Sequence, residues 1–286
     1  PYAVLYTSLG CPFRCDFCCI NALFGKNTIR YRSAEAVLAE VDWLVREWGV
    51  RNIKLMDEMF LMHPRHVSAI CEGLAVRGYD LNIWAYARVN TVTPDMLLQA
   101  RRAGIRWLSY GFESANRRVL EAAHKDYDPA HTMQIVRQTR DAGIYLLANY
   151  IFGLPEDTCD SMQESLDQAM EMNSEWANLY CAMAYPGSTL YRDARARGVA
   201  LPQRWSQYSQ YAPDCLPLPT NHIAAEQVLR FRDHAFTAYY RNPRYENRIR
   251  DVFGDETLAF VRTMAAKELP RDYQRTPPAL PRKDSC

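Results

Sequence analysis

A regular alternation of apolar and amphipathic runs most constrains how this chain of 286 residues can fold. Six apolar runs are separated by segments of helical periodicity, and they read "YAVLYTSL", "VRNIKLM", "YDLNIWAYA", "IRWLSYGF", "IYLLANYIFG" and "WANLYCAMAY". Such runs have the composition of buried parallel strands. Strands joined by helices run parallel with right-handed crossovers. We therefore expect an α/β fold with six strand–helix units, a partial (βα)6 barrel, because a full barrel needs eight.

The helical segments carry recognisable start signals. Ser33, Thr93 and Asp128 each stand immediately before a helical run, as N-cap residues do, and a proline follows two of them. Two further helices are expected at about 159–172 and at 188–197. Glycines such as Gly49 close several of these runs, as left-handed C-terminal caps do.

The pattern changes after residue 198. We expect residues 1–198 to form the partial barrel and residues 199–270 to form a mainly helical C-terminal extension, broken near Asn242–Pro243. Residues 271–286 are rich in proline and charge, which predicts a disordered tail. In the extension, Trp205, Tyr208 and Tyr211 either line a substrate cavity or serve only as packing.

Charge and hydropathy exclude several classes of protein. With 34 basic and 33 acidic side chains the formal charge is +1, which favours neither nucleic acid nor an anionic membrane as a partner. No run of about 20 apolar residues and no signal-peptide pattern is present, so we expect a cytoplasmic protein. The chain begins at Pro1 and enters a strand-like run at once, which indicates a piece excised from a longer protein.

The stretch "SLGCPFRCDFCCI" places three cysteines in one loop after the first predicted strand. Cys11, Cys15 and Cys18 have the spacing C-x₃-C-x₂-C, and thiolates at such intervals can converge on one iron–sulfur cluster. Three ligands leave one iron open for substrate. Zinc is the alternative, although a structural zinc site takes four ligands. A redox pair of Cys15 and Cys18 leaves Cys11 unexplained.

This loop in this fold resembles the radical S-adenosylmethionine (SAM) superfamily over about residues 1–198, and Phe17 before Cys18 is similar to the family's motif. The resemblance implies a [4Fe-4S] cluster held by the three cysteines, whose open iron binds SAM. An external electron donor of the flavodoxin or ferredoxin type then drives cleavage of SAM to a 5′-deoxyadenosyl radical, which abstracts hydrogen from a small-molecule substrate. The resemblance identifies no catalytic acid or base.

The same resemblance implies contacts to SAM at the ends of the predicted strands. Arg88 would hold the SAM carboxylate through paired hydrogen bonds, and Tyr185 would lie near the adenine. An ion pair between Arg88 and Glu113, and a turn cap at Asp57, are the structural alternatives. The full set of expected cofactor contacts is Phe17, Asp57, Glu58, Arg88, Glu113, Ser114, Asn149, Gly153 and Tyr185.

Longer matches narrow the resemblance to cobalamin-dependent radical SAM proteins. They include "YTSLGCPFRCDFCCINALFG", "NYIFGLP", "AMAYPGSTLY" and "VLRFRDHAF". Members of this group carry a cobalamin-binding domain before the barrel, and this chain has no D-x-H-x-x-G cobalamin motif. The resemblance implies methyl transfer from methylcobalamin to an unactivated carbon or phosphorus of a biosynthetic intermediate. The alternatives are a radical SAM oxidative cyclase or dehydrogenase without methyl transfer, and a non-catalytic zinc module.

Overall fold

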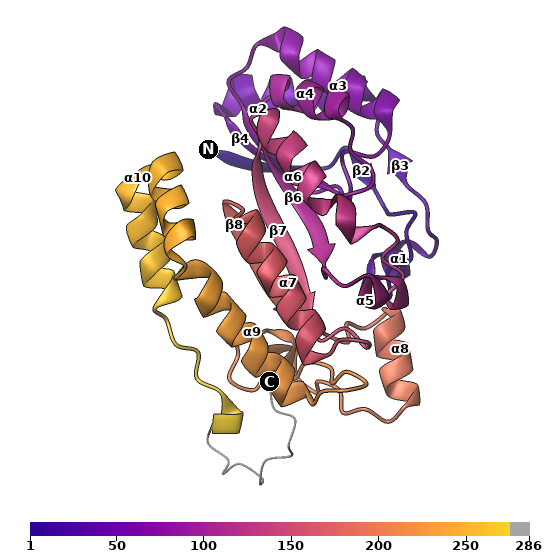
Figure 1. Ribbon diagram of the computed structural model, residues 1–286. Coiled ribbons are helices and arrows are strands. Elements are labelled where there is room, and N and C mark those ends of the chain that lie inside the picture. Colours follow the sequence, from indigo (N-terminus) through magenta and orange to yellow (C-terminus); the bar gives the residue numbers. More distant parts are fainter. Residues whose placement is uncertain (275–286) are drawn as a thin grey trace. The chain divides into compact units, whose positions relative to one another are not determined.

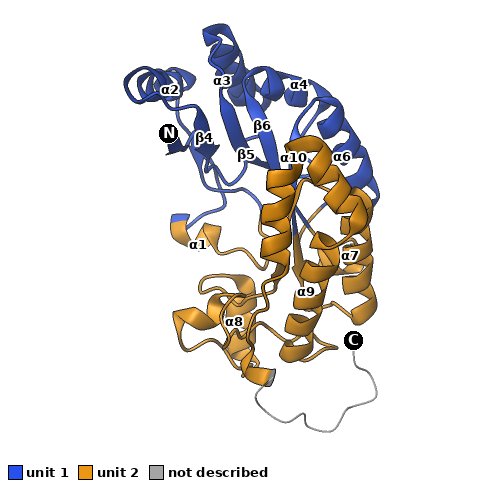
Figure 2. Cartoon of the chain, turned by 90° about the vertical axis from the view of Figure 1, so that its left-hand side faces the viewer, with its two compact units in different colours: residues 1–13, 24–112, 127–149 blue, residues 14–23, 113–126, 150–286 orange. Residues whose placement is uncertain are grey.

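The computed structural model describes residues 1–274, which form two compact units. Unit 1 comprises residues 1–13, 24–112 and 127–149, and unit 2 comprises residues 14–23, 113–126 and the chain from 150 onward. Figure 2 shows unit 1 in blue and unit 2 in orange. None of the helices within residues 1–274 is long and apolar enough to cross a membrane.

The six predicted strands form one sheet in the order β1-β4-β5-β6-β7-β8. The pairs β1–β4, β4–β5 and β5–β6 are parallel. Since the order follows the chain, the predicted α/β partial-barrel fold is confirmed. A separate antiparallel pair joins β2 to β3. The strands of the sheet are β1 Tyr2–Leu5, β4 Asn52–Leu55, β5 Asn82–Ala87, β6 Ile105–Glu113, β7 Tyr145–Phe152 and β8 Trp176–Cys181; the separate pair is β2 Ser8–Leu9 and β3 Arg30–Tyr31.

Helices α2, α3 and α4 of unit 1 lie side by side along the chain's first crossovers (Figure 1). The predicted caps hold, because Ser33 Oγ accepts a hydrogen bond from the α2 backbone and Thr93 Oγ1 accepts one from the α4 backbone. The N-cap of α3 is His63, a residue that carries no usual start signal. The helices of this unit are α2 Ala34–Trp48, α3 Pro64–Arg77, α4 Pro94–Arg102, the 3₁₀ turn η1 Pro129–His131 and α6 Thr132–Asp141.

Unit 2 holds the remaining helices of the described chain, apart from the last residue of α1. Helix α7 has the bounds expected from the sequence, and the break between α9 and α10 falls at Asn242, which caps α10 ahead of Pro243. The elements are α1 Ile20–Phe24, α5 Arg117–Ala122, α7 Cys159–Met172, α8 Thr189–Ala196, η2 Trp205–Tyr208, α9 Ala225–Tyr240, α10 Pro243–Ala265 and η3 Asp272–Gln274.

Two buried tyrosines tie the C-terminal extension to the last strand. Tyr239 donates a hydrogen bond to the Ser174 carbonyl (2.7 Å), and Tyr240 donates one to the Ala177 carbonyl (2.6 Å). Helix α9 therefore packs against β8 within unit 2. The predicted division between residues 198 and 199 is not the division between the compact units, because these side chains join the extension to the barrel's last strand.

The predicted disordered tail starts with ordered residues. The guanidinium of Arg271 has no exposed side-chain surface, and it donates to both carboxylate oxygens of Asp233 at 2.7 and 2.8 Å. It also donates to the carbonyls of Gln210 and Ala212. Residues 271–274 are therefore structured, contrary to the expectation, and the rest of the predicted tail lies outside the described residues.

Candidate cofactor site

The first cysteine follows a glycine that no other residue can replace without strain. Gly10 has φ +98°, and a Cβ there would lie 2.2 Å from the Thr28 carbonyl oxygen. Its N–H donates to Glu58 Oε2 at 2.8 Å. The backbone entering Cys11 is therefore held at the end of β4, where the sequence placed Glu58 as a cofactor contact. Both Cys11 and Glu58 are partly exposed.

Asp57 is fully buried, and its carboxylate accepts hydrogen bonds from other residues of the chain. Its Oδ1 accepts from the Thr7 N–H (2.7 Å), and its Oδ2 accepts from the hydroxyls of Thr7 (2.6 Å) and Ser8. The Thr7 hydroxyl donates its hydrogen to Asp57, so it accepts a hydrogen bond from His66 Nε2 at 3.0 Å. Burial lowers the pKa of His66. The carboxylate anchors the segment after β1. These bonds give Asp57 a structural role, and its predicted contact with SAM stays a prediction.

Arg88 lies at the end of β5 beside the cysteine loop. Only 3% of this residue is exposed, and its Nε donates to Asn90 Oδ1 at 2.9 Å. Its guanidinium carbon is 3.9 Å from the ring centroid of Phe13, which stands between Cys11 and Cys15 in the sequence. A cation over an aromatic face at this distance is an attractive contact. Arg88 thus contacts the cysteine loop within unit 1, and its predicted contact with the SAM carboxylate stays a prediction.

Asn149, in β7, is held by the neighbouring strand. Its side-chain nitrogen donates to Ser109 Oγ at 2.9 Å and to the Tyr110 carbonyl at 2.8 Å. The side chain is partly exposed. The two donated hydrogen bonds fix its orientation within unit 1.

The second half of the cysteine loop is fastened inside unit 2. The Cys18 N–H donates to the Cys15 carbonyl at 3.0 Å, so the two cysteines stand at the ends of one tight turn. Asp16, between them, donates its N–H to the Ala123 carbonyl and accepts from the Leu190 N–H. Cys18 is exposed and Cys15 partly exposed. Backbone contacts to α5 and α8 therefore hold the turn while the thiols remain accessible.

Glu113 forms an ion pair that the sequence did not reveal. Lys125 Nζ lies 2.7 Å from Glu113 Oε1, and each side chain is 8% exposed. Glu113 has φ +64°, a conformation that is rare for a non-glycine residue and concentrates at functional sites. Lys125 Nζ also lies 5.8 Å from the centroid of Phe17, the residue before Cys18. Residue spacing carries no signal for Lys125, because only the fold brings it to the end of β6.

Two further predicted contacts take part in packing. The Ser114 hydroxyl is fully buried, lies 3.1 Å from the Ser165 hydroxyl and accepts from the Asn116 N–H at 3.1 Å. Phe17 packs against a buried cluster that includes Ala182 and Leu190. These contacts give Ser114 and Phe17 structural roles in unit 2.

Gly153 lies at a crowded turn after β7. It has φ +84°, and a Cβ there would lie 2.4 Å from a methyl carbon of Val228 in α9. The N–H groups of Gly153 and Leu154 each donate to Asp157 Oδ2 at 2.9 Å. Burial raises the pKa of Asp157 to about 6, although these bonds and one from Ser161 oppose the rise. Asp157 is a second residue that the sequence analysis missed.

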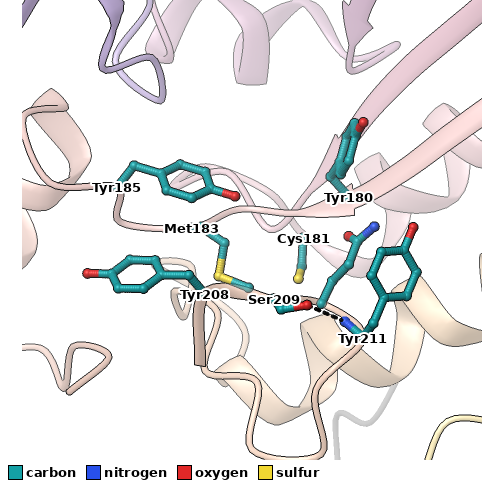
Figure 3. Close-up of a pocket in the computed structure, with 8 residues that line it drawn as sticks. Tyr180, Cys181, Met183, Tyr185, Tyr208, Ser209 and Tyr211 are labelled. Carbon is teal, nitrogen blue, oxygen red and sulfur yellow. Dashed lines mark hydrogen bonds between the residues drawn. The ribbon is translucent and has the colours of Figure 1, made fainter. Parts of the chain in front are cut away.

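Tyr185 follows β8 and lines a cavity of about 170 Å³ (Figure 3). Its ring stacks on that of Tyr208, with centroids 5.7 Å apart and planes inclined by 18°. Tyr211 also lines the cavity, whereas Trp205 does not and is 83% exposed. The cavity alternative therefore fits Tyr208 and Tyr211 but not Trp205.

The donor set of the loop fits an iron–sulfur cluster. Cys11, Cys15 and Cys18 stand in one stretch of eight residues. Among residues 1–274, no three His, Cys, Asp or Glu side chains are arranged to hold a metal ion. A cluster differs from a single ion because its cysteine ligands bind different irons. Three accessible thiols in one tethered loop provide such ligands.

Comparison with known proteins agrees with this fold and donor set. The sequence model of the Radical SAM superfamily matches residues 5–169. A protein of Pyrococcus horikoshii, named as an uncharacterised methyltransferase, is 29% identical over 96% of this chain. An anaerobic magnesium-protoporphyrin IX monomethyl ester cyclase of Cereibacter sphaeroides is 29% identical over 65% of it. The chain spans 58% of the first relative's length and 31% of the second's.

A solved structure shares the fold. The cobalamin-dependent S-adenosylmethionine radical enzyme OxsB, with aqua-cobalamin and S-adenosylmethionine bound, superposes with a TM-score of 0.63 at 15% sequence identity. The match covers 91% of this chain and 49% of that one. At this identity the likeness concerns the fold alone.

Proposed function

This chain belongs to the radical SAM superfamily, and from that premise we propose that it is the part of an enzyme that cleaves SAM reductively to a 5′-deoxyadenosyl radical. The observation that carries the proposal is the loop of Cys11, Cys15 and Cys18 directly after the first strand of a six-stranded parallel α/β fold. The family match spans this loop and the predicted SAM contacts other than Tyr185.

The three cysteines would hold a [4Fe-4S] cluster. Such a cluster, when bound, supplies an electron to the SAM sulfonium and an open iron for the amino and carboxylate groups of SAM. The protein's own part is to hold the loop through Gly10 and Asp16, whose backbone groups are bonded to Glu58, Ala123 and Leu190. An external donor of the flavodoxin or ferredoxin type would be the electron source.

Four of the predicted SAM contacts keep that role in the proposal, namely Glu58, Arg88, Glu113 and Asn149. Arg88 suits an anionic group such as the SAM carboxylate, because a guanidinium can donate two parallel hydrogen bonds to it. At Gly153 the missing Cβ makes room for Val228 of α9, so no SAM contact is proposed there. Fixing these groups before SAM arrives lowers the entropic cost of binding it.

We also propose that the whole protein transfers a methyl group to an unactivated carbon or phosphorus of a small molecule, with cobalamin as the methyl carrier. The support is the relative from Pyrococcus horikoshii, which is named as a methyltransferase and matches almost the whole chain. The shared fold with the cobalamin-dependent OxsB agrees with it. No residue of this chain is assigned to cobalamin. The balanced formal charge offers no reason to expect a nucleic-acid partner.

A cyclase is the second candidate. The relative from Cereibacter sphaeroides is named as a cyclase and is as identical to this chain as the first relative, although over a shorter stretch. An oxidative cyclisation forms a ring without adding carbon. The mass of the product formed by the whole protein separates the two, because a methyl group adds one carbon and two hydrogens.

The cluster assignment is tested by substituting two cysteines of the same loop, one predicted ligand and one not. After anaerobic reconstitution with iron and sulfide, Cys15→Ala should lose bound iron and should form no 5′-deoxyadenosine from SAM with dithionite. Cys19→Ala should keep both, because Cys19 is outside the C-x₃-C-x₂-C set. Retained 5′-deoxyadenosine formation in Cys15→Ala would refute the assignment. Colourless protein containing zinc would favour the zinc module instead.

A further inference from the structure

A cavity at the end of β8 lies wholly within unit 2. Two segments line it. One is residues 180–185, at the end of β8 and beyond it, and the other is residues 208–211, which begin at the last residue of η2. In Figure 3, Tyr185 and Tyr208 lie at one end, Tyr180 and Tyr211 lie at the other, and the sulfurs of Met183 and Cys181 lie between them. The volume is about 170 Å³, and the lining residues are Tyr180, Cys181, Met183, Tyr185, Tyr208, Ser209, Gln210 and Tyr211.

The lining of this cavity is neutral. None of the eight described lining residues carries a formal charge. Burial raises the pKa values of Tyr185 and Tyr208 above their usual range, so both phenols stay protonated at neutral pH. Moving an unpaired charged group out of water into such surroundings is unfavourable, because the lining offers it no opposite charge. A neutral ligand is therefore favoured.

The lining also presents flat aromatic surface. Tyr180, Tyr185 and Tyr211 are 37%, 44% and 58% exposed, which is high for rings that line a cavity. Aromatic rings prefer stacked or edge-to-face partners, and thioether sulfur packs well against ring edges. An apolar cavity of about 150 Å³ accepts a benzene molecule. The cavity thus has room for one ring or a small fused pair.

Buried arginines hold the extension side of the cavity in place. Arg271 donates to the carbonyls of Gln210 and Ala212, each at 2.8 Å. The side-chain amide of Gln210 lies 3.3 Å from both the Leu179 carbonyl and the Arg232 guanidinium. This wall is therefore formed before any ligand binds, which is typical of small-molecule sites.

We propose that this cavity binds a neutral, planar ring of the substrate. Its meaning as a substrate site rests on the proposed function, whereas the binding itself requires neither the cluster nor SAM. The proposal separates the cavity from the SAM adenine, near which the sequence analysis placed Tyr185. Adenine presents hydrogen-bond donors and acceptors along its edge, and the one carboxamide in the lining is already occupied by Leu179 and Arg232. An apolar ring needs no hydrogen-bond partner along its edge, so it loses no hydrogen bond on entering the cavity.

Indole is a suitable probe, because it is planar, neutral and small enough for the volume. The 286-residue chain without cluster, titrated with indole and followed by ligand-observed NMR, should bind it saturably.

Tyr208→Ala should weaken binding at least tenfold, and Tyr211→Ala provides a second variant in case the first disturbs folding. Phe260→Ala is the matched control and should bind as the unmodified chain does, because Phe260 is an exposed aromatic residue of α10 that does not line the cavity. Benzoate, which adds a negative charge to a ring, should bind at least tenfold more weakly.

Competition between SAM and indole shows whether the cavity is a substrate site or part of the SAM site. This competition uses the chain with its cluster reconstituted anaerobically, because SAM is proposed to bind through the open iron. Saturating SAM should then leave the indole affinity unchanged within twofold, and displacement of indole by SAM would assign the cavity to the adenine and overturn the proposal. The absence of saturable indole binding, or an equal loss in Phe260→Ala, would also overturn it. Loss of the cluster assignment in the cysteine experiment would not alter the indole result, so the two proposals fail separately.

Discussion

At the scale of single residues, the pair Lys125–Glu113 combines burial with an unusual backbone. Each side chain is 8% exposed, and the two charges are 2.7 Å apart. Removing one partner of a buried pair leaves an uncompensated charge, which costs about 3–5 kcal/mol. The positive φ of Glu113 adds strain that the surrounding contacts must offset. Lys125 therefore holds the glutamate that the proposal assigns to SAM.

Lys125→Met should lower the free energy of unfolding by about 3 kcal/mol, because it leaves the Glu113 carboxylate buried without its partner. Adding Glu113→Gln should recover part of that loss, since the double variant buries no charge at this pair. Denaturant titrations of the chain, both single variants and the double variant form a double-mutant cycle. Additive losses would show that the two side chains are not coupled.

At the scale of elements, the connection from β7 to α7 depends on one carboxyl group. Asp157 is 1% exposed and accepts from the N–H groups of Gly153 and Leu154 and from the Ser161 hydroxyl. It thereby shapes the turn that brings Gly153 against α9. Burial nevertheless raises its pKa from 3.8 to about 6. The folded state therefore binds this proton more tightly than the unfolded state does.

The sign of the pH dependence follows from that difference. The stabilisation by this group is full below the unfolded pKa of 3.8 and is lost as the pH rises through about 6. Between pH 5 and pH 7 the loss is about 1 kcal/mol. Asp157→Asn removes the titration, so its free energy of unfolding should change by about 1 kcal/mol less over this interval than that of the unmodified chain. Asp160→Asn, an exposed position in the first turn of α7, is the control and should keep the original dependence. An unchanged pH dependence in Asp157→Asn would contradict the raised pKa.

At the scale of the whole molecule, the two compact units are interleaved in sequence. Each draws on separate stretches of the chain, so contacts distant in sequence close each unit. In unit 2 the last described residues provide such a closure. Arg271 joins Asp233 of α9 to the carbonyls of Gln210 and Ala212, and no part of its side chain is exposed.

Arg271→Met should therefore destabilise unit 2 by about 3 kcal/mol, because it leaves buried carbonyls and part of a buried ion pair without partners. Amide hydrogen exchange should accelerate in residues 205–215 and β8, with no change in α2 of unit 1. Arg192→Ala is the matched control. Its ion pair with Asp193 is exposed on α8 of the same unit, so its loss should cost less than about 1 kcal/mol. Exchange that accelerates equally in both units would argue against a closure local to unit 2.

Local pattern in the sequence determined the elements of this protein. The six strand positions, the caps at Ser33 and Thr93, the bounds of α7 and the break before Pro243 all follow from residue periodicity and capping chemistry. The cysteine spacing and the longer motif matches likewise indicated the family, since ligand spacing within one loop is a local property. Helix α3 lies where a helical segment was expected, but no usual signal in the sequence marked its first residue, because His63 is not a usual cap.

Only the tertiary structure decided what the individual site residues do. Asp57 was predicted to contact SAM, and the structure adds that its carboxylate holds Thr7 and Ser8, which lie 50 and 49 residues earlier in the chain. Lys125 and Asp157 bond to Glu113 and Gly153 without any local signal in the sequence, and Tyr185 stacks on Tyr208 at one end of the cavity. Periodicity reports which face of an element is buried. It does not report which distant polar groups will satisfy a buried charge, because that depends on the packing of segments far apart in the chain.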